Sequence, residues 1–206
     1  MKIISRRKIM KKRFAIIMLI TMIMSIFVVN ETKAYAAQSF TPCPLRGQQK
    51  SNWCWAASTQ MLLETKGYNR TQSAICTYIH GQVINRGGSA NNVAAAARWG
   101  SNYSLDFDLN GPLPFSGARS VVSSINNGWS IAVGCFNSDR TIGHTMVITG
   151  YDTNNSSVWL QDPQGTVNSF PAPGKETWCG YNALVSGNYS GTKFSYLNIK
   201  WLTSVN

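Results

Sequence analysis

The stretch 48-QQKSNWCWAASTQMLLETKG-67 decides the expected fold. It is rich in Ala, Met and Leu from Trp53 to Lys66, and it ends at Gly67, a residue that commonly stops helices. No charged side chain occurs from Trp53 to Leu63. We therefore expect a central helix that is buried over most of its circumference.

The pattern along the chain changes from helical to extended on the carboxyl side of this segment. Helices first and strands second predict an α+β fold with segregated halves, in which a central helix is followed by an antiparallel sheet. The spacing of apolar residues predicts shorter helices at 72–80, 91–99 and 116–125. Runs of β-branched and aromatic residues predict strands at 131–136, 145–151, 157–161 and 194–201.

The amino terminus is expected to lie outside this domain. Seven basic side chains precede the uncharged apolar run 14–29, which is shorter than the about 20 residues that a membrane-spanning helix needs. Ala34-Tyr35-Ala36 supplies the small residues of a cleavage site. We expect residues 1–36 to be a cleaved signal peptide and 37–206 to be one secreted, monomeric domain. The same apolar run retained as a membrane anchor is the alternative.

Composition and charge exclude several classes of protein. One core of ordinary size would use the whole length after processing, which excludes a multi-domain enzyme. The chain has 19 basic and 8 acidic residues, and eight of the basic and one of the acidic residues lie in the expected signal peptide, so the net charge falls from +11 to +4. Because the remaining chain has no block of like charges, we expect no nucleic-acid partner, and no membrane partner after cleavage.

The chain has five cysteines, an odd number. An odd number of cysteines in an exported chain leaves at least one unpaired, and if four of them pair, three connectivities are possible. All five can equally be reduced, because about 170 residues can stabilise a core without disulfides. The five are Cys43, Cys54, Cys76, Cys135 and Cys179.

Other catalytic motifs are absent from the sequence. Two histidines and no C-x-x-C motif give poor support for a zinc site, and no P-loop, G-x-S-x-G or G-x-G-x-x-G motif is present. We therefore expect neither a metal nor a cofactor. A thiol, a histidine and a carboxylate remain as the groups that could carry chemistry.

Cys54 is the candidate nucleophile. It lies at the first turn of the expected helix, which Ser51 or Asn52 can cap. Unpaired backbone N–H groups and the helix dipole favour a negative charge there, so the thiolate of Cys54 should be stabilised. The alternative is a small buried hydrophobic residue without reactivity.

His144 and Asp162 are the candidate base and orienting acid. The stretches 143–151 and 157–162 look like one β-hairpin, and if it is symmetric about Thr153, His144 lies opposite Asp162. Directly opposed residues have Cβ atoms about 5 Å apart, which would let the carboxylate accept the Nδ1–H of the imidazole. A hydrogen-bonded core histidine and a turn aspartate are the alternatives.

Four further polar residues lie near these groups in the sequence or in the expected fold. Asp152 is expected at the hairpin tip, eight residues from His144 and at about 3.3 Å per residue too far to orient it. His80, four residues after Cys76, is expected to be an ordinary surface residue. Gln48 or Gln49, six and five residues before Cys54, can donate from its amide to an oxyanion formed by thiolate attack on a carbonyl; an ordinary loop glutamine is the alternative.

Gln48, five intervening residues and Cys54-Trp55-Ala56-Ala57-Ser58 resemble the papain-like cysteine peptidases. The stretches 143-GHTMVITGY-151 and 161-QDP-163 resemble the His and Asp blocks of compact bacterial members, including plant-pathogen effector proteases and the leader peptidases of bacteriocin export. The resemblance aligns Gln48, ahead of Gln49, with the oxyanion glutamine of the family. It implies a papain-like fold with the Cys on the central helix and the His and Asp on the sheet.

The chain also departs from the plant papains. It lacks the Cys-Gly pair before the nucleophile, its His144 follows Cys54 by 90 residues and not by the longer plant-type interval, and it has Asp162 where papain has Asn. The plant-type disulfide pattern and substrate preference therefore do not transfer.

These observations predict a secreted cysteine endopeptidase that hydrolyses protein or peptide substrates through an acyl-thioester. Cys54 would attack, His144 would carry the proton, Asp162 would orient it, and Gln48 with the Cys54 N–H would bind the oxyanion. A thiol acyltransferase or a peptidoglycan amidase with the same triad is one alternative. A non-enzymatic binding module that uses the seven Trp and eight Tyr residues is another.

Overall fold

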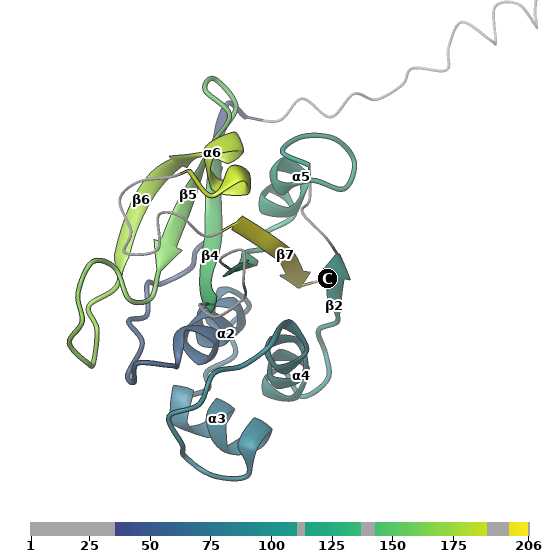
Figure 1. The fold of residues 1–206 in the computed structure, drawn as a ribbon. Coiled ribbons are helices and arrows are strands. Elements are labelled where there is room, and N and C mark those ends of the chain that lie inside the picture. Colours follow the sequence, from purple (N-terminus) through teal and green to yellow (C-terminus); the bar gives the residue numbers. More distant parts are fainter. Residues whose placement is uncertain (1–35, 111–113, 137–142, 189–197, 206) are drawn as a thin grey trace, which may run out of the picture. The chain divides into compact units, whose positions relative to one another are not determined.

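One antiparallel sheet forms the frame of the protein (Figure 1). The computed structural model describes residues 36–110, 114–136, 143–188 and 198–205. The strand order is β2-β7-β3-β4-β5-β6, and β1 pairs with β4 off this path. The strands are β1 (Gln38–Phe40), β2 (Phe107–Asn110), β3 (Ile131–Phe136), β4 (Gly143–Asp152), β5 (Ser157–Asp162), β6 (Lys175–Gly180) and β7 (Asn198–Val205).

Helices cover the sheet in two groups. Figure 1 shows one group in the lower part of the view and the other in its upper part. The lower group is α2 (Cys54–Thr65), α3 (Gln72–His80) and α4 (Ala90–Gly100), and the upper group is α5 (Val121–Asn126) and α6 (Tyr181–Ser186). This arrangement of helices and an antiparallel sheet confirms the expected α+β class.

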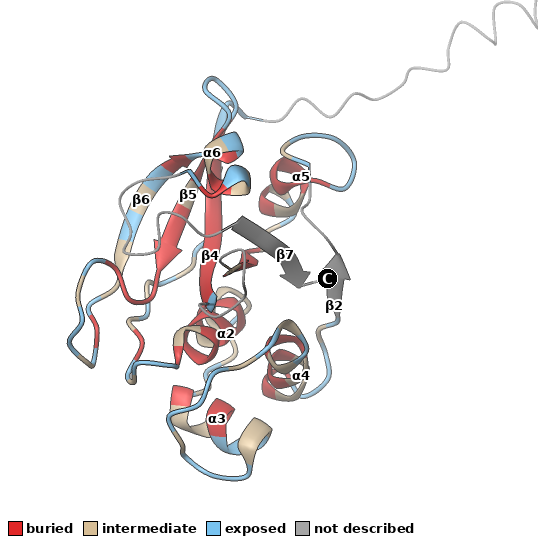
Figure 2. Cartoon of the chain, in the orientation of Figure 1, coloured by how far each residue is buried: buried red, intermediate tan, exposed pale blue. Residues whose placement is uncertain are grey.

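Two hydrophobic cores lie on opposite faces of the central strands. Along β3, Ile131 and Val133 pack with α5, whereas Ala132 between them packs with α2, α3 and α4. On β4, Val147 packs on the same side as Ala132. Because successive side chains of a strand point to opposite faces, one strand can serve both cores. The middle of the sheet is therefore buried on both sides, as Figure 2 shows for β4 and β5.

The helix α2 is the central helix that the sequence predicts. Eight of its 12 residues are buried, and Gly67 follows it with a φ of 80°, which a glycine adopts without strain. The expected caps are wrong, because Trp53 is the residue before the helix and no side chain caps it. The polar groups of Ser51 and Asn52 are instead hydrogen-bonded to Asn85.

Some elements match their expected limits and others do not. The bounds of α3 and β3 are those predicted, and α4 differs by one residue at each end. The helix predicted at 116–125 begins only at Val121, because Ser120 caps it there in a capping box with Ser123. Part of the strand predicted at 194–201 lies outside the described residues, and β7 starts at Asn198. The strands β1, β2 and β6 and the helix α6 were not predicted.

The expected signal peptide lies outside the described residues, except for Ala36. Within the part of the chain that the structure describes, no helix is long and apolar enough to cross a membrane.

Candidate active site

Cys54 is the first residue of α2 and is partly exposed. Burial raises the pKa of its thiol, but the hydrogen bond and the charge of His144 lower it, as do the backbone N–H groups of Thr145 and Trp55. The net effect is a thiol pKa below its ordinary value of 9.0. The first turn of α2 contains no acidic side chain, so nothing there opposes the favourable helix dipole.

His144 is the second residue of β4 and is buried. Burial lowers the pKa of its imidazole, but the hydrogen bond and charge of Asp162, with a smaller contribution from Cys54, raise it to about 9. One turn along α2, the Ser58 hydroxyl donates to the Thr145 carbonyl at 3.1 Å. This bond ties the helix to the strand close to both Cys54 and His144.

Asp162 ends β5 and is completely buried. Its Oδ1 lies 2.6 Å from His144 Nε2 and also accepts the N–H of Gln164 at 2.9 Å. The expectation that His144 bonds Asp162 through Nδ1 is wrong, because Nε2 makes this bond. Nδ1 is thereby left for the hydrogen bond with Cys54. Asp162 Oδ2 is buried without a hydrogen-bond partner.

The hairpin of β4 and β5 has a different register from the expected one. Its closing pair is Asp152 with Ser157, so the turn is centred between Asn154 and Asn155 instead of on Thr153. Asp152 bonds Gln38 and the Asn154 N–H, away from the site, as its position at the hairpin tip predicted. The turn contains the four residues 153–156, so its centre lies one and a half residues beyond Thr153.

A bulge in β4 brings His144 and Asp162 to one face of the hairpin. The register shifts between Ile148 and Gly150, which leaves Thr149 without a partner on β5. If Thr149 were paired regularly, every earlier residue would move by one position, and His144 and Asp162 would point to opposite faces. With the bulge, His144 lies two residues from the position level with Asp162. The two side chains therefore meet diagonally, and the expectation of direct opposition is wrong.

The thiol, imidazole and carboxylate form one continuous chain. Because the pKa of Cys54 is lowered and that of His144 is raised, the proton between them resides preferentially on the imidazole. The Asp162 carboxylate stabilises the resulting imidazolium across the 2.6 Å bond. This arrangement can supply a thiolate nucleophile at neutral pH and a proton donor beside it.

Gln48 lies in the loop before α2 and is completely buried. Its Nε2 donates to the carbonyls of Lys50 at 3.1 Å and Ser51 at 2.9 Å, while its Oε1 is buried without a partner. Both amide hydrogens therefore face carbonyl oxygens of the same loop. Donation to an oxyanion would require one of these bonds, the longer one to Lys50 first, to be exchanged.

The loop that contains Ile84 and Arg86, for which no contact was predicted, is hydrogen-bonded to the start of α2. The indole of Trp53 donates to the Ile84 carbonyl at 2.7 Å, and the indole of Trp55 donates to the Arg86 carbonyl at 3.0 Å. The two tryptophans flank Cys54 in the sequence, so these bonds hold the loop to the segment that carries Cys54. The pair Trp53 and Trp55 on either side of Cys54 was the signal that could have revealed this contact.

His80 and the four other cysteines lie outside the chain of hydrogen bonds from Cys54 to Asp162. His80 packs edge-on against Trp55, with ring centroids 5.5 Å apart, so it is more engaged than the expected surface residue. All five cysteines lie among the described residues, and none forms a disulfide. Within the described ranges, no group of three His, Cys, Asp or Glu side chains could hold a metal ion.

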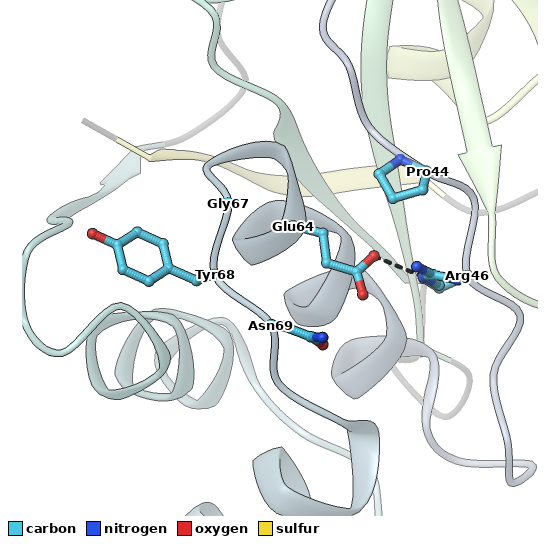
Figure 3. Close-up of a pocket in the computed structure, with 6 residues that line it drawn as sticks. All are labelled: Pro44, Arg46, Glu64, Gly67, Tyr68 and Asn69. Atoms are coloured by element: carbon cyan, nitrogen blue, oxygen red, sulfur yellow. Dashed lines mark hydrogen bonds and ion pairs between the residues drawn. The ribbon is translucent and has the colours of Figure 1, made fainter.

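A surface pocket lies at the opposite end of α2 from Cys54 (Figure 3). The ion pair between Arg46 and Glu64, 2.7 Å long, crosses its wall. Because α2 has 12 residues at about 1.5 Å rise each, Glu64 stands roughly 15 Å along the helix from Cys54. The pocket is therefore separate from the thiol and its partners.

The chain is similar to known peptidases in its sequence pattern and in its fold. A family model described as the Peptidase C39 like family matches residues 33–183. A crystal structure of a double glycine motif protease from an AMS/PCAT transporter, in complex with the leader peptide, is 16% identical with a TM-score of 0.53, over 81% of this chain and 93% of that chain. A C39-like peptidase from Bacillus anthracis is 11% identical with a TM-score of 0.51, over 82% of this chain and 97% of that one. These two likenesses show a shared fold. Among curated proteins, none matches the chain significantly.

Proposed function

The chain belongs to the Peptidase C39 like family, and on that premise we propose that it is a secreted endopeptidase in which Cys54, His144 and Asp162 form the catalytic triad. The family assignment makes the chain a papain-like cysteine protease, a hydrolase, and confirms the resemblance found in the sequence. The observation that carries the triad proposal is the hydrogen-bonded chain from the Cys54 thiol through His144 to Asp162.

The proposed reaction has two halves. The Cys54 sulfur attacks the scissile carbonyl carbon, and the carbonyl electron pair moves onto its oxygen. The imidazolium of His144 then protonates the leaving amide nitrogen, the C–N bond breaks, and an acyl-thioester remains on Cys54. In the second half, His144 takes a proton from water, the resulting hydroxide attacks the thioester, and the thiolate is released.

Asp162 and Gln48 have supporting roles in this proposal. Asp162 orients the imidazole through Nε2, so that Nδ1 faces the thiol. The backbone N–H of Cys54 lacks an intrahelical partner, because Cys54 is the first residue of α2, and it is available as one oxyanion donor. The Gln48 amide supplies the second donor once its contact with the Lys50 carbonyl is exchanged.

The substrate in this proposal is an extended polypeptide. The solved double glycine motif protease is similar in fold and holds a leader peptide, which supports a peptide substrate here. Secretion is proposed from the basic cluster, the apolar run 14–29 and the Ala34-Tyr35-Ala36 site. Cell fractionation of the full chain with sequencing of the new amino terminus tests it, and a cell-bound chain that retains residues 1–36 would contradict secretion.

Mass spectrometry of an unfolded protein substrate tests the peptidase activity. The reduced protein is incubated with the substrate beside the Cys54→Ala and His144→Ala variants. We expect new peptides with the wild type only, and their termini would define the specificity. Equal cleavage by the Cys54→Ala variant would refute the proposal. If Cys54 reacts with thiol reagents but the protein cleaves no peptide, acyl transfer and the hydrolysis of cell-wall amides become the activities to test.

A further inference from the structure

On the side of the sheet, backbone hydrogen bonds hold the loop that carries Gln48. The Gln48 N–H donates to the Pro163 carbonyl at 2.8 Å, and the Gln48 carbonyl accepts the Ala172 N–H at 2.9 Å. A Cβ added to Gly47 would lie 1.8 Å from the Ala172 carbonyl oxygen, so these backbones are in close contact. Pro163 follows Asp162 directly, which connects this anchor to the triad.

A single side chain, Gln72, holds the same loop from the side of the helices. It is the first residue of α3, and its side chain is buried. Its Oε1 accepts the N–H of Gln49 at 2.9 Å, and its Nε2 donates to the carbonyl of Gly47 at 2.9 Å. Nε2 also lies 3.3 Å from Gln60 Oε1. One amide thus bonds the peptide groups on both sides of Gln48.

The helix α3 does not need the polar atoms of Gln72. Thr71 caps the helix by accepting the Ala74 N–H at 3.2 Å, and the Gln72 amide is directed away to the loop. A buried amide is stable only when its donors and acceptors are used, and here the loop uses them. The hydrogen bonds of Gln72 are therefore committed to fixing the Gly47–Gln49 backbone.

We propose that Gln72 is a positioning residue that holds the Gln48 amide where it can donate to the oxyanion. The inference rests on the role of Gln48 proposed above. An oxyanion donor is effective only when it is preorganised, because a misplacement of about 1 Å can cost roughly 100-fold in rate. The carbonyls of Lys50 and Ser51 hold the Gln48 amide nitrogen against its own loop. The position of that loop therefore determines where the amide can donate.

Two reactions of Cys54 separate positioning from general stability. The thiolate displaces iodide from iodoacetamide in one step that forms no oxyanion. With p-nitrophenyl acetate, the thiolate adds to the ester carbonyl, an oxyanion forms, and its collapse expels p-nitrophenolate and leaves an acetyl-thioester. The ratio of acylation rate to alkylation rate therefore reports the oxyanion site alone, and it needs no knowledge of the natural substrate.

We expect Gln72→Ala to lower the acylation rate by about 10- to 100-fold while the alkylation rate stays within about twofold. Gln48→Ala should lower acylation by about 100-fold or more, and the double variant should be no slower than Gln48→Ala. Gln60→Ala is the matched control, because of the contacts of Gln72 it removes only the one at 3.3 Å. It also removes the bond from Gln60 to Glu64, which stands at the far end of α2 from Cys54, so both rates should stay unchanged.

The outcomes distinguish this inference from the proposed function. Two results would show that Gln72 has only a structural role. One is an equal loss of acylation and alkylation in Gln72→Ala, and the other is an acylation rate in the double variant that falls by the product of the two single losses. If Gln72→Ala does not fold, Gln72→Met fills similar space without either hydrogen bond to the loop, and it should likewise lose acylation and keep alkylation. If Gln48→Ala itself acylates normally, the proposed role of Gln48 fails. A slow Gln48→Ala beside a normal Gln72→Ala overturns only the role of Gln72.

Discussion

The proton shared by Cys54 and His144 sets the pH range in which the thiol is reactive. Alkylation by iodoacetamide should rise with pH through a midpoint below 9.0, because the thiol pKa is lowered. In His144→Ala, the hydrogen bond and the charge that lower this pKa are lost and burial remains, so the midpoint should move above that of the wild type. Alkylation rates from pH 5 to pH 10 measure both midpoints. A wild-type midpoint at or above that of the variant would contradict the thiolate–imidazolium pair.

The carboxylate of Asp162 holds the proton on His144. Asp162→Asn keeps an oxygen for His144 Nε2 and for the Gln164 N–H but loses the charge, so the pKa of His144 should fall from about 9. The alkaline limb of kcat/KM should therefore move to lower pH, with a loss of about tenfold at neutral pH. Asp162→Ala, which also removes the orienting bond, should lose about 100-fold or more. An unchanged alkaline limb in Asp162→Asn would show that the charge does not act on His144.

At the scale of single residues, the sequence indicated which side chains meet but not how they meet. The motif around Cys54 and the hairpin around His144 and Asp162 were sufficient to bring the three together. The diagonal pairing of His144 with Asp162 could not be predicted. Every residue of β4 after Gly143 is buried, so the strand has no alternation of apolar and polar residues that the bulge at Thr149 would interrupt. The bonds of Gln72 were equally invisible, since they depend on tertiary contact.

Among the elements, the loop beside α2 is fixed by close contact with an indole. A Cβ added to Gly88 would lie 2.4 Å from the Trp55 ring, whereas one added to Gly87 would meet nothing within 4 Å. Gly88→Ala should therefore displace the loop or the indole next to Cys54, destabilise the protein by about 1–3 kcal/mol and lower kcat/KM.

The neighbouring glycine provides the matched control for this prediction. Gly87→Ala should leave stability within about 0.5 kcal/mol of the wild type. Urea unfolding and kcat/KM of the two variants make the comparison. Equal behaviour of Gly87→Ala and Gly88→Ala would show that the contact with Trp55 is unimportant.

Elements with a strong local signal were predicted, and short ones were not. The limits of α3 follow from its capping threonine and its apolar spacing, and β3 is a continuous run of small and apolar residues. The strand β1 has only three residues, too few to show a period, and its pairing with β4 is a tertiary contact. The helix α6 has six residues between two glycines and no side-chain cap, so no start signal marks it.

For the whole molecule, His144 and Cys54 contribute to stability in ways that change in opposite directions with pH. The pKa of His144 is raised from 6.5 to about 9, so its contribution is complete below pH 6.5 and is lost as the pH rises toward 9. The pKa of Cys54 is lowered, so its contribution is present above 9.0 and is lost as the pH falls. The two trends oppose each other between pH 6.5 and 9.

Removing the thiol should expose the trend of the imidazole. The free energy of unfolding of Cys54→Ala, relative to the wild type, should fall as the pH rises from 6.5 to 9, because Asp162 still raises the pKa of His144. Urea unfolding of both proteins at pH 6.5, 7.5 and 8.5 measures the difference. A difference that stays constant or grows in favour of the variant would argue against the coupled pair.

The start of β1 also has a practical consequence. The carbonyl of Ala37 accepts the N–H of Thr153, which follows β4 at the tip of the hairpin, nine residues after His144. At about 3.3 Å per residue, that is roughly 30 Å along the strand from His144. An affinity tag, a fluorophore or a solid support attached just before Ala37 would therefore be anchored at the end remote from the thiol, so an immobilised form of the protein should keep its reactive end open to substrates in the surrounding solution.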